Sequence, residues 1–478
     1  MTFRSLSLTA AALWFIFAPR LRFEVQAAEP KGAADVRLKA SERREQGGWI
    51  YVHLEGSPNS IGFQHGYLLA KEIEDLLRVI KPFQEKTTGR EWAFYRQASE
   101  TMLWKGIDRE YQDEIDGIVM GLNAQGVKAD RWDLVALNAL EELPYYYAPW
   151  LDQKEGKKPS AHAPGNCSAF IATGNATKDR RIVMGHNCWT NYVTGSRWNI
   201  VFDVKPERGN RILMDGLPGV IVSDDDFAIN SAGMMITETT ITHFNGWDPA
   251  GRPEFSRARK AMQYATSIDE FVKIMVAGNN GGYANDWLVG DNKTGEIALF
   301  ELGLEHYIVK RTKDGVYFGS NFPVDDELAR TETTFDATKK ESSPLARKTR
   351  WEQLIKERFG KIDVEIAEEM ESDDYDVITG KHEANERTLC GIVEVSPRGV
   401  PEWDWGPFFP GGTVQSKVVD GKMAEHMKIW AAFGHASGPD FHVCEFLKEH
   451  PEYEWMRDLL GDLKKGPWTK FEASNYSK

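Results

Sequence analysis

The chain has 478 residues, a formal net charge of -14 at pH 7, and 41% hydrophobic and 12% aromatic residues. This composition excludes an intrinsically disordered protein, because the apolar share is ample for a packed core. The acidic balance disfavours nonspecific binding to nucleic acid, which depends on basic side chains that neutralise phosphates. The length exceeds what one hydrophobic core usually spans, so one large domain and two domains both stay open.

Residues 1–27 are typical of a cleaved signal peptide. Arg4 precedes an apolar run from Leu8 to Ala18, and small residues at Val25 and Ala27 have the spacing of a signal-peptidase site. The apolar run is short for a helix that spans a bilayer. The charged residues between this run and the cleavage site are unusual for a signal peptide, so a retained membrane anchor is the alternative. No later segment is apolar enough for a membrane helix. We therefore expect an exported protein without stable membrane insertion.

Residues 28–166 are expected to form a mostly helical segment. Apolar residues recur at helical spacing over residues 62–80 and again over residues 115–122. A polar, proline-bearing stretch over residues 152–165 ends the segment and has the character of an exposed linker.

Residues 167–478 are expected to form the core domain. Short apolar runs separated by turn residues predict strands at residues 168–172, 181–184, 198–204, 227–230, 234–239, 287–290, 296–300 and 306–309. Helical patterns occur at residues 256–264, 268–275 and 344–358. Because strands and helices cluster separately, the pattern favours an α+β fold of antiparallel sheets covered by helices.

The chain has four cysteines, Cys167, Cys188, Cys390 and Cys444. Four in so long a chain do not make a disulfide framework, even in an exported protein. No CxxC pair is present, which disfavours a structural zinc site. We expect no cofactor and no bound metal.

Cys167 is the strongest candidate for a catalytic residue, because it follows the linker and begins a predicted strand. Its thiol could attack the carbonyl of Asn166, pass through a thioester, and be released as a new N-terminus. The freed α-amine would then serve as the base of the thiol. On residue type alone, a cysteine that opens a strand is more often a small buried hydrophobe.

Several short motifs favour the catalytic interpretation of Cys167. They lie at residues 62–69 (GFQHGYLL), 121–126 (GLNAQG), 137–138 (LN), 166–170 (NCSAF) and 185–192 (GHNCWTNY). Their order and spacing resemble the N-terminal-nucleophile (Ntn) hydrolases with a cysteine nucleophile. Within these, the chain is similar to the autoproteolytic family typified by isopenicillin N acyltransferase and to the phospholipase B-like proteins. The resemblance covers about residues 57–438. It implies a four-layer αββα sandwich and self-cleavage between Asn166 and Cys167.

The resemblance also implies an oxyanion hole, a set of preorganised hydrogen-bond donors for the charge that develops during acyl transfer. Asn285 matches the asparagine whose side-chain amide is one donor, whereas the alternative is a turn before the strand at Trp287. The second donor would be a backbone N–H near Glu238 or Thr239. Glu238 itself is either a base or the partner of a strand neighbour.

Arg347 matches an arginine that related enzymes place beside the nucleophile, where a fixed positive charge would favour the thiolate. Arg350 shares its helical face and could take the same role. The alternative for either arginine is a solvated charge on the surface of an amphipathic helix.

His186 and Trp189 lie in the segment that is most similar to phospholipase B-like proteins. Related amidases have an acidic residue near the position of Cys188 or Trp189, and it contacts the free α-amine. This chain has no carboxylate there, so His186, Asn187 or a backbone carbonyl would have to orient the amine. A papain-like Cys–His dyad also stays open, with four candidate partners: His65, His186, His382 and His435.

The expected reaction is transfer of an acyl group from a small-molecule amide, or from a lipid-like ester, to Cys167 and then to water. An acyltransferase that passes the group to an amine is the nearest alternative. A catalytically silent phospholipase B-like binding protein is another, since 16 tryptophans would suit a glycan- or lipid-binding surface. The sequence leaves the acyl group, the acceptor and the oligomeric state open.

Overall fold

The computed structural model describes residues 35–159 and 167–476. The predicted signal peptide and Asn166 lie outside the described residues. Of the two compact units of the chain, the larger contains the described residues from Arg37 onward. The architecture below is that of the larger unit.

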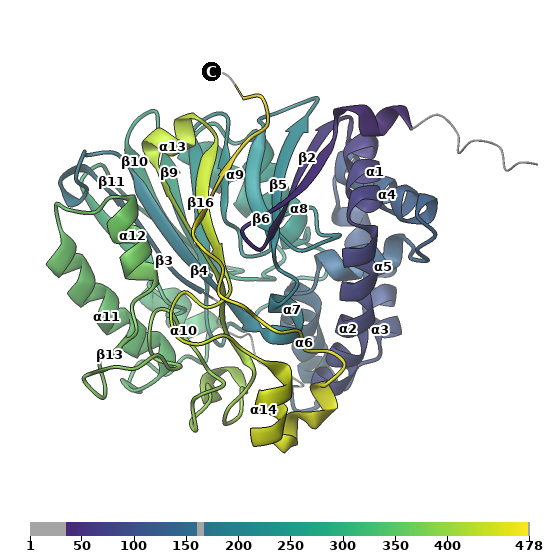
Figure 1. The fold of residues 1–478 in the computed structure, drawn as a ribbon. Helices are drawn as coiled ribbons and strands as arrows, with labels where there is room; N and C mark the ends of the chain where they lie inside the picture. The colour runs from purple at the N-terminus through teal and green to yellow at the C-terminus, as the bar shows by residue number, and fades with distance from the viewer. Residues whose placement is uncertain (1–34, 160–166, 477–478) are drawn as a thin grey trace, which may run out of the picture. The chain divides into compact units, whose positions relative to one another are not determined.

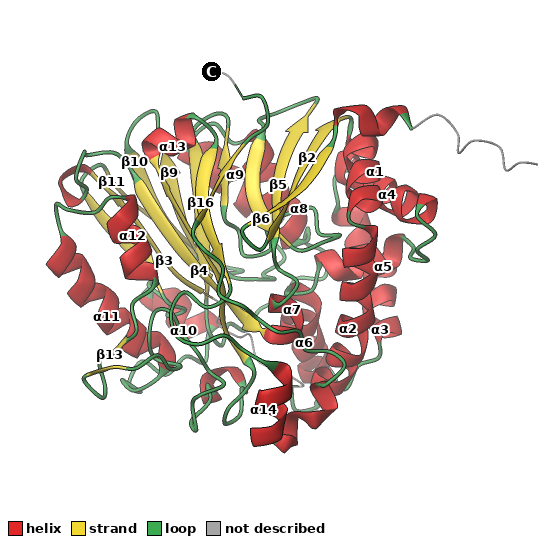
Figure 2. Ribbon diagram, viewed as in Figure 1, coloured by secondary structure: helices red, strands yellow, loops and turns green. Residues whose placement is uncertain are grey.

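The larger of its two main sheets has nine strands (Figures 1 and 2). In spatial order they are β1 (Glu42–Gln46), β2 (Trp49–Gly56), β5 (Ile200–Pro206), β6 (Ile212–Gly216), β7 (Ala228–Asn230), β8 (Met234–Thr240), β9 (Asn285–Asp291), β10 (Glu296–Leu302) and β11 (Tyr307–Thr312). β2 pairs with β5 in parallel, whereas the other neighbours in this sheet are antiparallel.

The second sheet has six strands, all paired antiparallel. In spatial order they are β12 (Gly315–Gly319), β3 (Cys167–Thr173), β4 (Val183–Asn191), β15 (Gly411–Asp420), β16 (Lys428–Phe433) and β17 (Thr469–Glu472). A separate small hairpin joins β13 (Tyr375–Asp376) to β14 (Lys381–His382).

Fourteen α-helices surround the sheets in the described residues. They are α1 (Pro58–Leu68), α2 (Ala70–Thr88), α3 (Trp92–Ala98), α4 (Arg109–Ala124), α5 (Arg131–Asn138), α6 (Ala148–Lys154), α7 (Tyr192–Gly195), α8 (Glu254–Tyr264), α9 (Ile268–Val276), α10 (Asp326–Glu332), α11 (Ser343–Arg358), α12 (Val364–Glu371), α13 (Gly421–Glu425) and α14 (Val443–Glu449). Short 3-10 and π turns connect several of them, among them a π turn at Leu143–Tyr147 and a 3-10 turn at Pro401–Trp403.

The two main sheets pack face to face, with β3 and β12 against β8, β9 and β10. Side chains of β3 alternate between two cores, as expected for a strand buried on both faces. Ala169 and Ile171 join the main core between the sheets, whereas Phe170 and Ala172 join a second core with Trp351 of α11. Helices α11 and α12 thus cover the six-stranded sheet, while α8 and α9 contact the nine-stranded one (Figure 1).

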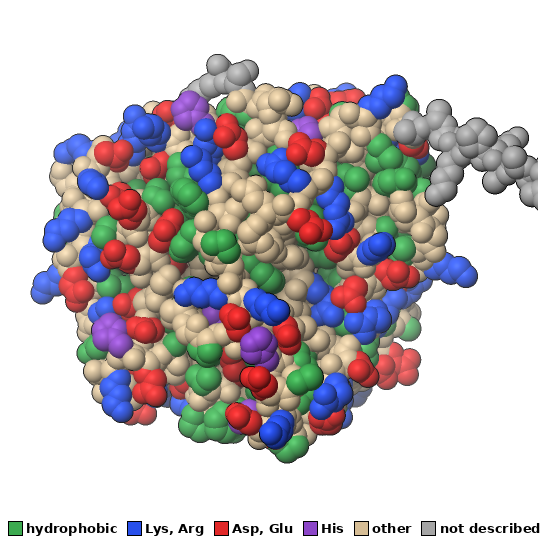
Figure 3. Space-filling model, viewed as in Figure 1, with side chains coloured by type: hydrophobic (Ala, Val, Ile, Leu, Met, Phe, Trp, Pro, Cys, Tyr) green, Lys and Arg blue, Asp and Glu red, His purple; other side chains and the backbone are tan. Residues whose placement is uncertain are grey.

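The surface has acidic and basic side chains interspersed over the face drawn in Figure 3. On that face the net charge of -14 is therefore spread out rather than gathered in one patch.

Most strands predicted after Cys167 are present, and the mixed α/β fold is confirmed. The runs at 168–172, 198–204, 234–239 and 287–290 correspond to β3, β5, β8 and β9. The pattern did not predict β1 and β2, which lie in the segment that was expected to be mostly helical. These two strands extend the large sheet because β2 pairs with β5. The residues of β4 beyond position 184 were read only as a motif, although the strand continues to Asn191.

Three glycines of the first two motifs, Gly62, Gly66 and Gly121, are explained by helix packing. A Cβ atom on Gly62 or Gly66 of α1 would lie 1.8 or 2.1 Å from backbone oxygens of α4, and one on Gly121 of α4 would lie 2.3 Å from the Phe63 oxygen. Only glycine therefore permits this close approach of α1 to α4.

The first and third motifs, at residues 62–69 and 137–138, supply polar side chains that hold a loop after β6. The Gly219 N–H donates to Nε2 of His65 at 2.8 Å. Asn138 donates from its side-chain amide to the Gly219 carbonyl at 2.9 Å and accepts from the Ile221 N–H at 2.8 Å. All these groups are buried, so the bonds fix the course of the loop that leads to residues 223–227.

Replacement of Gly121 by alanine should destabilise the chain, although the same change on an exposed helix face stabilises by about 1 kcal/mol. The added methyl group would overlap the backbone of α1, and overpacking of this kind costs about 1–3 kcal/mol. Thermal unfolding of Gly121→Ala measures the effect. Asn123→Ala, on the exposed face of the same helix, is the matched control and should unfold at or above the parent temperature. Equal or higher stability of Gly121→Ala would contradict the close-packing explanation.

Candidate active site

Cys167 opens β3 and pairs in register with Cys188 of β4. Its side chain is fully buried, and its Sγ donates to Oε1 of Glu238 at 3.6 Å. All four cysteines are free thiols. A buried, unbridged thiol thus faces a carboxyl group from the opposite sheet.

Glu238 lies in β8 and has Cys167 and Tyr283 as its hydrogen-bond partners. The Tyr283 hydroxyl donates to Oε1 at 3.1 Å, whereas Oε2 has no partner in the described part of the chain. Burial, together with the neighbouring Cys167, raises the pKa of Glu238 well above its usual range. Glu238 is therefore held as the neutral acid near neutral pH.

His186 lies in β4, and it is the histidine of the four candidates that the fold brings to Cys167. Ligand-capable atoms of His186, Cys167 and Glu238 all lie within 4.8 Å of one another. Burial, followed by the nearby Lys417, lowers the pKa of His186 to about 3. The ring is therefore neutral under physiological conditions.

The other three candidate histidines have other environments. His65 accepts from the Gly219 N–H. His435 contacts Tyr192, with 2.9 Å between its Nε2 and the hydroxyl oxygen. His382 is exposed.

Arg347, near the start of α11, is fully buried rather than solvated. Its Nη1 donates to the Cys167 carbonyl at 2.8 Å and to the Ser168 hydroxyl at 2.9 Å. Its Nη2 donates to Oδ1 of Asn321 at 2.9 Å, and Nε donates to the Ser343 hydroxyl at 3.1 Å. Every nitrogen of the guanidinium is thus bonded to a neutral acceptor.

Arg350 does not share this position, although it lies one turn further along α11. It forms a bidentate pair with Asp373 at 2.8 and 2.7 Å. Of the two candidate arginines, the structure therefore places only Arg347 beside Cys167.

Trp189 of β4 covers the guanidinium of Arg347, with 4.4 Å from Cζ to the ring centroid. Trp403 packs edge-on against Trp189 at 5.8 Å. A Cβ on Gly391 would lie 1.8 Å from the Trp189 ring, so glycine is required there. Stacking on an aromatic face stabilises a desolvated cation, and Trp189 acts on Arg347 in this way.

Asn285 is the first residue of β9, so the alternative of a turn at this position is wrong. Its side chain is fully buried, and neither its oxygen nor its nitrogen has a hydrogen-bond partner among the described residues. An unpaired buried amide is costly. The amide is therefore available to a bound oxygen.

The backbone near Thr239 is open on one side. β8 pairs with β7 only at Met235 and Ile236 in the described ladder, whereas β9 pairs with β8 as far as Thr240. A Cβ on Gly319 of β12 would lie 2.0 Å from the Thr239 hydroxyl, which shows how closely the second sheet approaches β8. The backbone beyond Ile236 thus lacks a β7 partner where the two sheets meet.

An ion cluster that the sequence analysis missed lies behind His186. Lys417 of β15 bonds to Asp225, and its Nζ lies 3.2 Å from Oδ2 of Asp215. Burial opposes the charge of Lys417, but these two carboxylates raise its pKa. Burial raises the pKa of Asp225, yet Lys417 prevails and lowers it to about 2. The only sequence signal was three successive aspartates, residues 224–226, after an apolar run.

Two buried carboxyl groups from distant elements approach strands β3 and β4. Glu238 is one, and Glu371 of α12 is another, fully buried with both oxygens unpartnered among the described residues. Gly185 permits this approach, because a Cβ there would lie 2.6 Å from Glu371 Oε1. Asn187 is used elsewhere, since its amide donates to the carbonyls of Glu371 and Leu389 at 2.7 and 3.0 Å.

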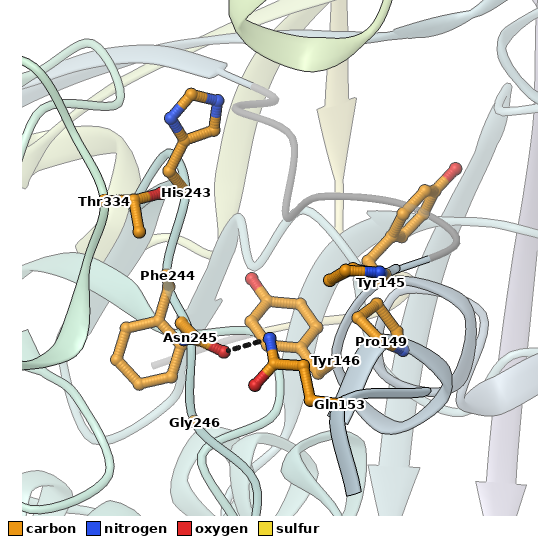
Figure 4. A pocket seen from close by; sticks show the side chains of 10 residues that line it. Tyr145, Tyr146, Pro149, Gln153, His243, Phe244, Asn245, Gly246 and Thr334 are labelled. Atoms are coloured by element: carbon orange, nitrogen blue, oxygen red, sulfur yellow. Dashed lines mark hydrogen bonds between the residues drawn. The ribbon is translucent and has the colours of Figure 1, made fainter. Parts of the chain in front are cut away.

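A pocket of about 150 Å³ is lined by ten residues, none of which belongs to the cluster around Cys167 (Figure 4). Its walls include Tyr146 and Phe244, and Gln153 donates to Asn245 at 3.1 Å. Burial, together with Glu141 and Glu238, raises the pKa of Tyr146, which indicates that the pocket wall is close to the site. Cys167 itself does not line the pocket, because it is fully enclosed.

Buried carboxyls near the site predict a pH dependence of stability. Burial, then the neighbouring Glu142, raises the pKa of Glu254 from 4.5 to about 8. Between these values the folded chain keeps a proton that the unfolded chain has lost, so stability should fall as pH rises, by about 1.4 kcal/mol per unit and group. Thermal unfolding from pH 5 to pH 8 tests this. Glu254→Gln should lessen the decline, and the exposed control Glu91→Gln should not. An equal pH dependence of stability in Glu254→Gln and in the parent protein would refute the assignment.

Comparisons with known proteins agree with the resemblance drawn from the motifs. The Phospholipase B family model matches residues 79–301. An uncharacterized protein of Archaeoglobus fulgidus is 25% identical over 289 residues, covering 55% of this chain and 45% of that protein. Putative phospholipase B-like 1 of Caenorhabditis elegans is 30% identical over 163 residues, with 32% and 28% of the two chains covered. Putative phospholipase B-like 2 of Rattus norvegicus is 32% identical over 160 residues, with 29% and 26% covered.

The chain therefore spans less than half the length of these relatives. Among solved structures, a mutant conjugated bile acid hydrolase from Clostridium perfringens aligns with a TM-score of 0.31 and 14% identity, covering 55% of this chain and 88% of that chain. No helix in the described residues is long and apolar enough to cross a membrane. The matched stretch includes Cys167, His186, Glu238 and Asn285. The chain is similar to phospholipase B-like proteins over part of its length.

Proposed function

We propose that this protein is an Ntn-type hydrolase that cleaves itself before Cys167 and then uses Cys167 as its nucleophile. The observation that carries the proposal is the environment of Cys167. Its thiol contacts Glu238, while its own carbonyl is bound by the buried guanidinium of Arg347. A structural core cysteine needs neither partner.

Self-cleavage would proceed by an acyl shift at the bond between residues 166 and 167. The Cys167 sulfur attacks the Asn166 carbonyl, the C–N bond breaks, and the nitrogen takes a proton and becomes the free α-amine. Water then hydrolyses the thioester, which leaves a carboxylate on Asn166 and restores the thiol. The products are two chains, one of which begins at Cys167.

In the mature enzyme the α-amine would take the thiol proton, and the sulfur would attack the substrate carbonyl. The negative charge that develops on the carbonyl oxygen would be stabilised by the Asn285 amide and by a backbone N–H near Glu238 or Thr239. The amine leaving group takes a proton, and water then releases the acyl group from Cys167. Glu238 is close enough to orient the α-amine, in place of the acidic residue that related amidases use.

Arg347 would provide the fixed positive charge of the site. Its hydrogen bond to the Cys167 carbonyl fixes the main chain of the nucleophile, and its charge favours an anionic sulfur or oxyanion nearby. Trp189 and Asn321 act through Arg347, as positioning residues that keep the guanidinium in place.

The two packed sheets with α8 and α9 on one side and α11 and α12 on the other support the assignment of a four-layer αββα sandwich. The substrate class we propose is an amide, with a lipid-like ester as the alternative that the phospholipase B-like relatives favour. An acyltransferase would use the same acyl-enzyme and differ only in the acceptor. We propose that the protein is exported, with residues 1–27 removed.

Purified protein should consist of two associated pieces, the second starting at Cys167, because the cleavage needs no other protease. N-terminal sequencing and gel electrophoresis measure this directly. Cys167→Ala should stay intact, and the buried-thiol control Cys390→Ala should be cleaved like the parent protein. A fragment that begins at residue 167 in Cys167→Ala would disprove self-cleavage.

Asn285→Ala should lower single-turnover acylation by about 10²-fold or more, because one lost oxyanion donor withholds stabilisation from the transition state. The melting temperature should change little, since the amide makes no hydrogen bond in the described part of the fold. Mass spectrometry of acylated Cys167 gives the rate, and thermal unfolding gives the stability. Asn230→Ala is the contrasting variant, because the Asn230 amide donates to two backbone carbonyls and should affect stability instead. Acylation of Asn285→Ala at the parent rate would remove Asn285 from the site.

A further inference from the structure

Three side chains of different strands meet at the end of β3 with the donor set of a zinc site. Cys167 comes from β3, His186 from β4 and Glu238 from β8. Their ligand-capable atoms lie within 4.8 Å of one another, and the Sγ to Oε1 distance is 3.6 Å. All three side chains are fully buried.

Two of the three carry polar atoms that the protein leaves unsatisfied. Neither ring nitrogen of His186 has a hydrogen-bond partner in the described residues, and neither has Oε2 of Glu238. Buried polar groups without partners are rare, and each calls for an explanation, such as an ion. A cation between these atoms would satisfy them together.

The surroundings of His186 resemble the outer shell of known metal sites. Its Nδ1 lies 3.7 Å from Oδ2 of Asp225, and Asp225 is bonded in turn to Lys417. Metal-binding histidines commonly direct one ring nitrogen at a carboxylate, which fixes the tautomer and leaves the other nitrogen for the metal. In this chain Nε2 would be the free nitrogen.

We propose that Cys167, His186 and Glu238 bind a zinc ion that reversibly blocks the nucleophile. Zinc is the class of metal that accepts one sulfur, one nitrogen and one carboxylate oxygen with an open fourth position, whereas calcium and magnesium require oxygen ligands. The sequence did not reveal these three zinc ligands as a motif, because they belong to three separate strands.

Zinc binding involves no change of oxidation state. Bonds form from zinc to the sulfur, the imidazole nitrogen and one carboxyl oxygen, and the protons of the Cys167 thiol and the Glu238 carboxyl pass to solvent. A sulfur that is coordinated in this way cannot attack a carbonyl. The inhibition rests on the proposed function, whereas the binding itself does not.

The experiment is a zinc titration of the full chain, followed by removal of free metal and measurement of bound zinc by elemental mass spectrometry. We expect one zinc per chain for the parent protein, and loss of the bound zinc in Cys167→Ser, His186→Gln and Glu238→Gln. Cobalt in place of zinc should give a thiolate-to-cobalt charge-transfer absorption that vanishes in Cys167→Ser. Zinc should also slow alkylation of Cys167 by iodoacetamide by about tenfold or more, because a metal-bound thiolate is a poor nucleophile.

Matched controls separate the site from adventitious binding. Cys390→Ser removes another buried thiol, and His382→Gln removes an exposed imidazole, so both should keep the zinc. Circular dichroism of each variant shows whether it is folded. Absence of stoichiometric zinc from the folded parent protein, or its retention by all three ligand variants, would overturn the proposal.

The outcome is independent of the proposed hydrolase activity. A chain that binds zinc but is neither cleaved nor acylated after a chelator has removed the metal would refute only the proposed function. A chain that is cleaved and acylated but takes up no zinc would refute only the metal site.

Discussion

A guanidinium removed from water must keep every nitrogen bonded, since a buried and unsatisfied charge is among the costliest defects in a fold. Arg347 meets this requirement with groups from three separate segments: Cys167 and Ser168 at the start of β3, Asn321 after β12, and Ser343 at the start of α11. Asn321, which has a positive φ of 70°, also donates from its side-chain amide to the Thr240 carbonyl. The same side chain therefore links β8 to the Arg347 guanidinium. The position of Cys167 is thereby fixed by the need to satisfy one charge.

The scaffold behind His186 depends on residues far from Cys167. His65 and Asn138 hold the loop after β6, and that loop leads to Asp225. Lys417 on the opposite sheet then holds Asp225 in contact range of His186. The early motifs are therefore best explained as packing and positioning elements, which accounts for their glycines as well as for their polar side chains.

Local patterns were sufficient for the strands that alternate in a regular way and for the place of Cys167 at the start of β3. They were insufficient for β1 and β2, because β2 joins the sheet by pairing with β5, about 150 residues further along the chain. Asn285 and Arg347 were found through the family resemblance, because a lone asparagine or arginine carries no periodic signal. Glu371 and Lys417 were missed, since their burial depends on contacts between elements that the sequence does not show. Such residues are visible only after the two sheets are packed together.

The electrostatics of the site follow from which of its groups are held neutral. Burial keeps His186 uncharged and keeps Glu238 protonated, so neither contributes a formal charge beside Cys167. Lys417 is compensated by Asp225 and Asp215. Arg347 forms no ion pair within 4.0 Å among the described residues, although burial lowers its pKa to about 9 and Cys167 and Glu402 oppose that shift. A cation without a directly bonded carboxylate favours the species that carry an extra negative charge, namely a thiolate and a tetrahedral oxyanion. The same environment disfavours a metal cation until Cys167 and Glu238 lose their protons. The proposed zinc binding therefore depends on pH, because acid returns these protons to the ligands and releases the metal.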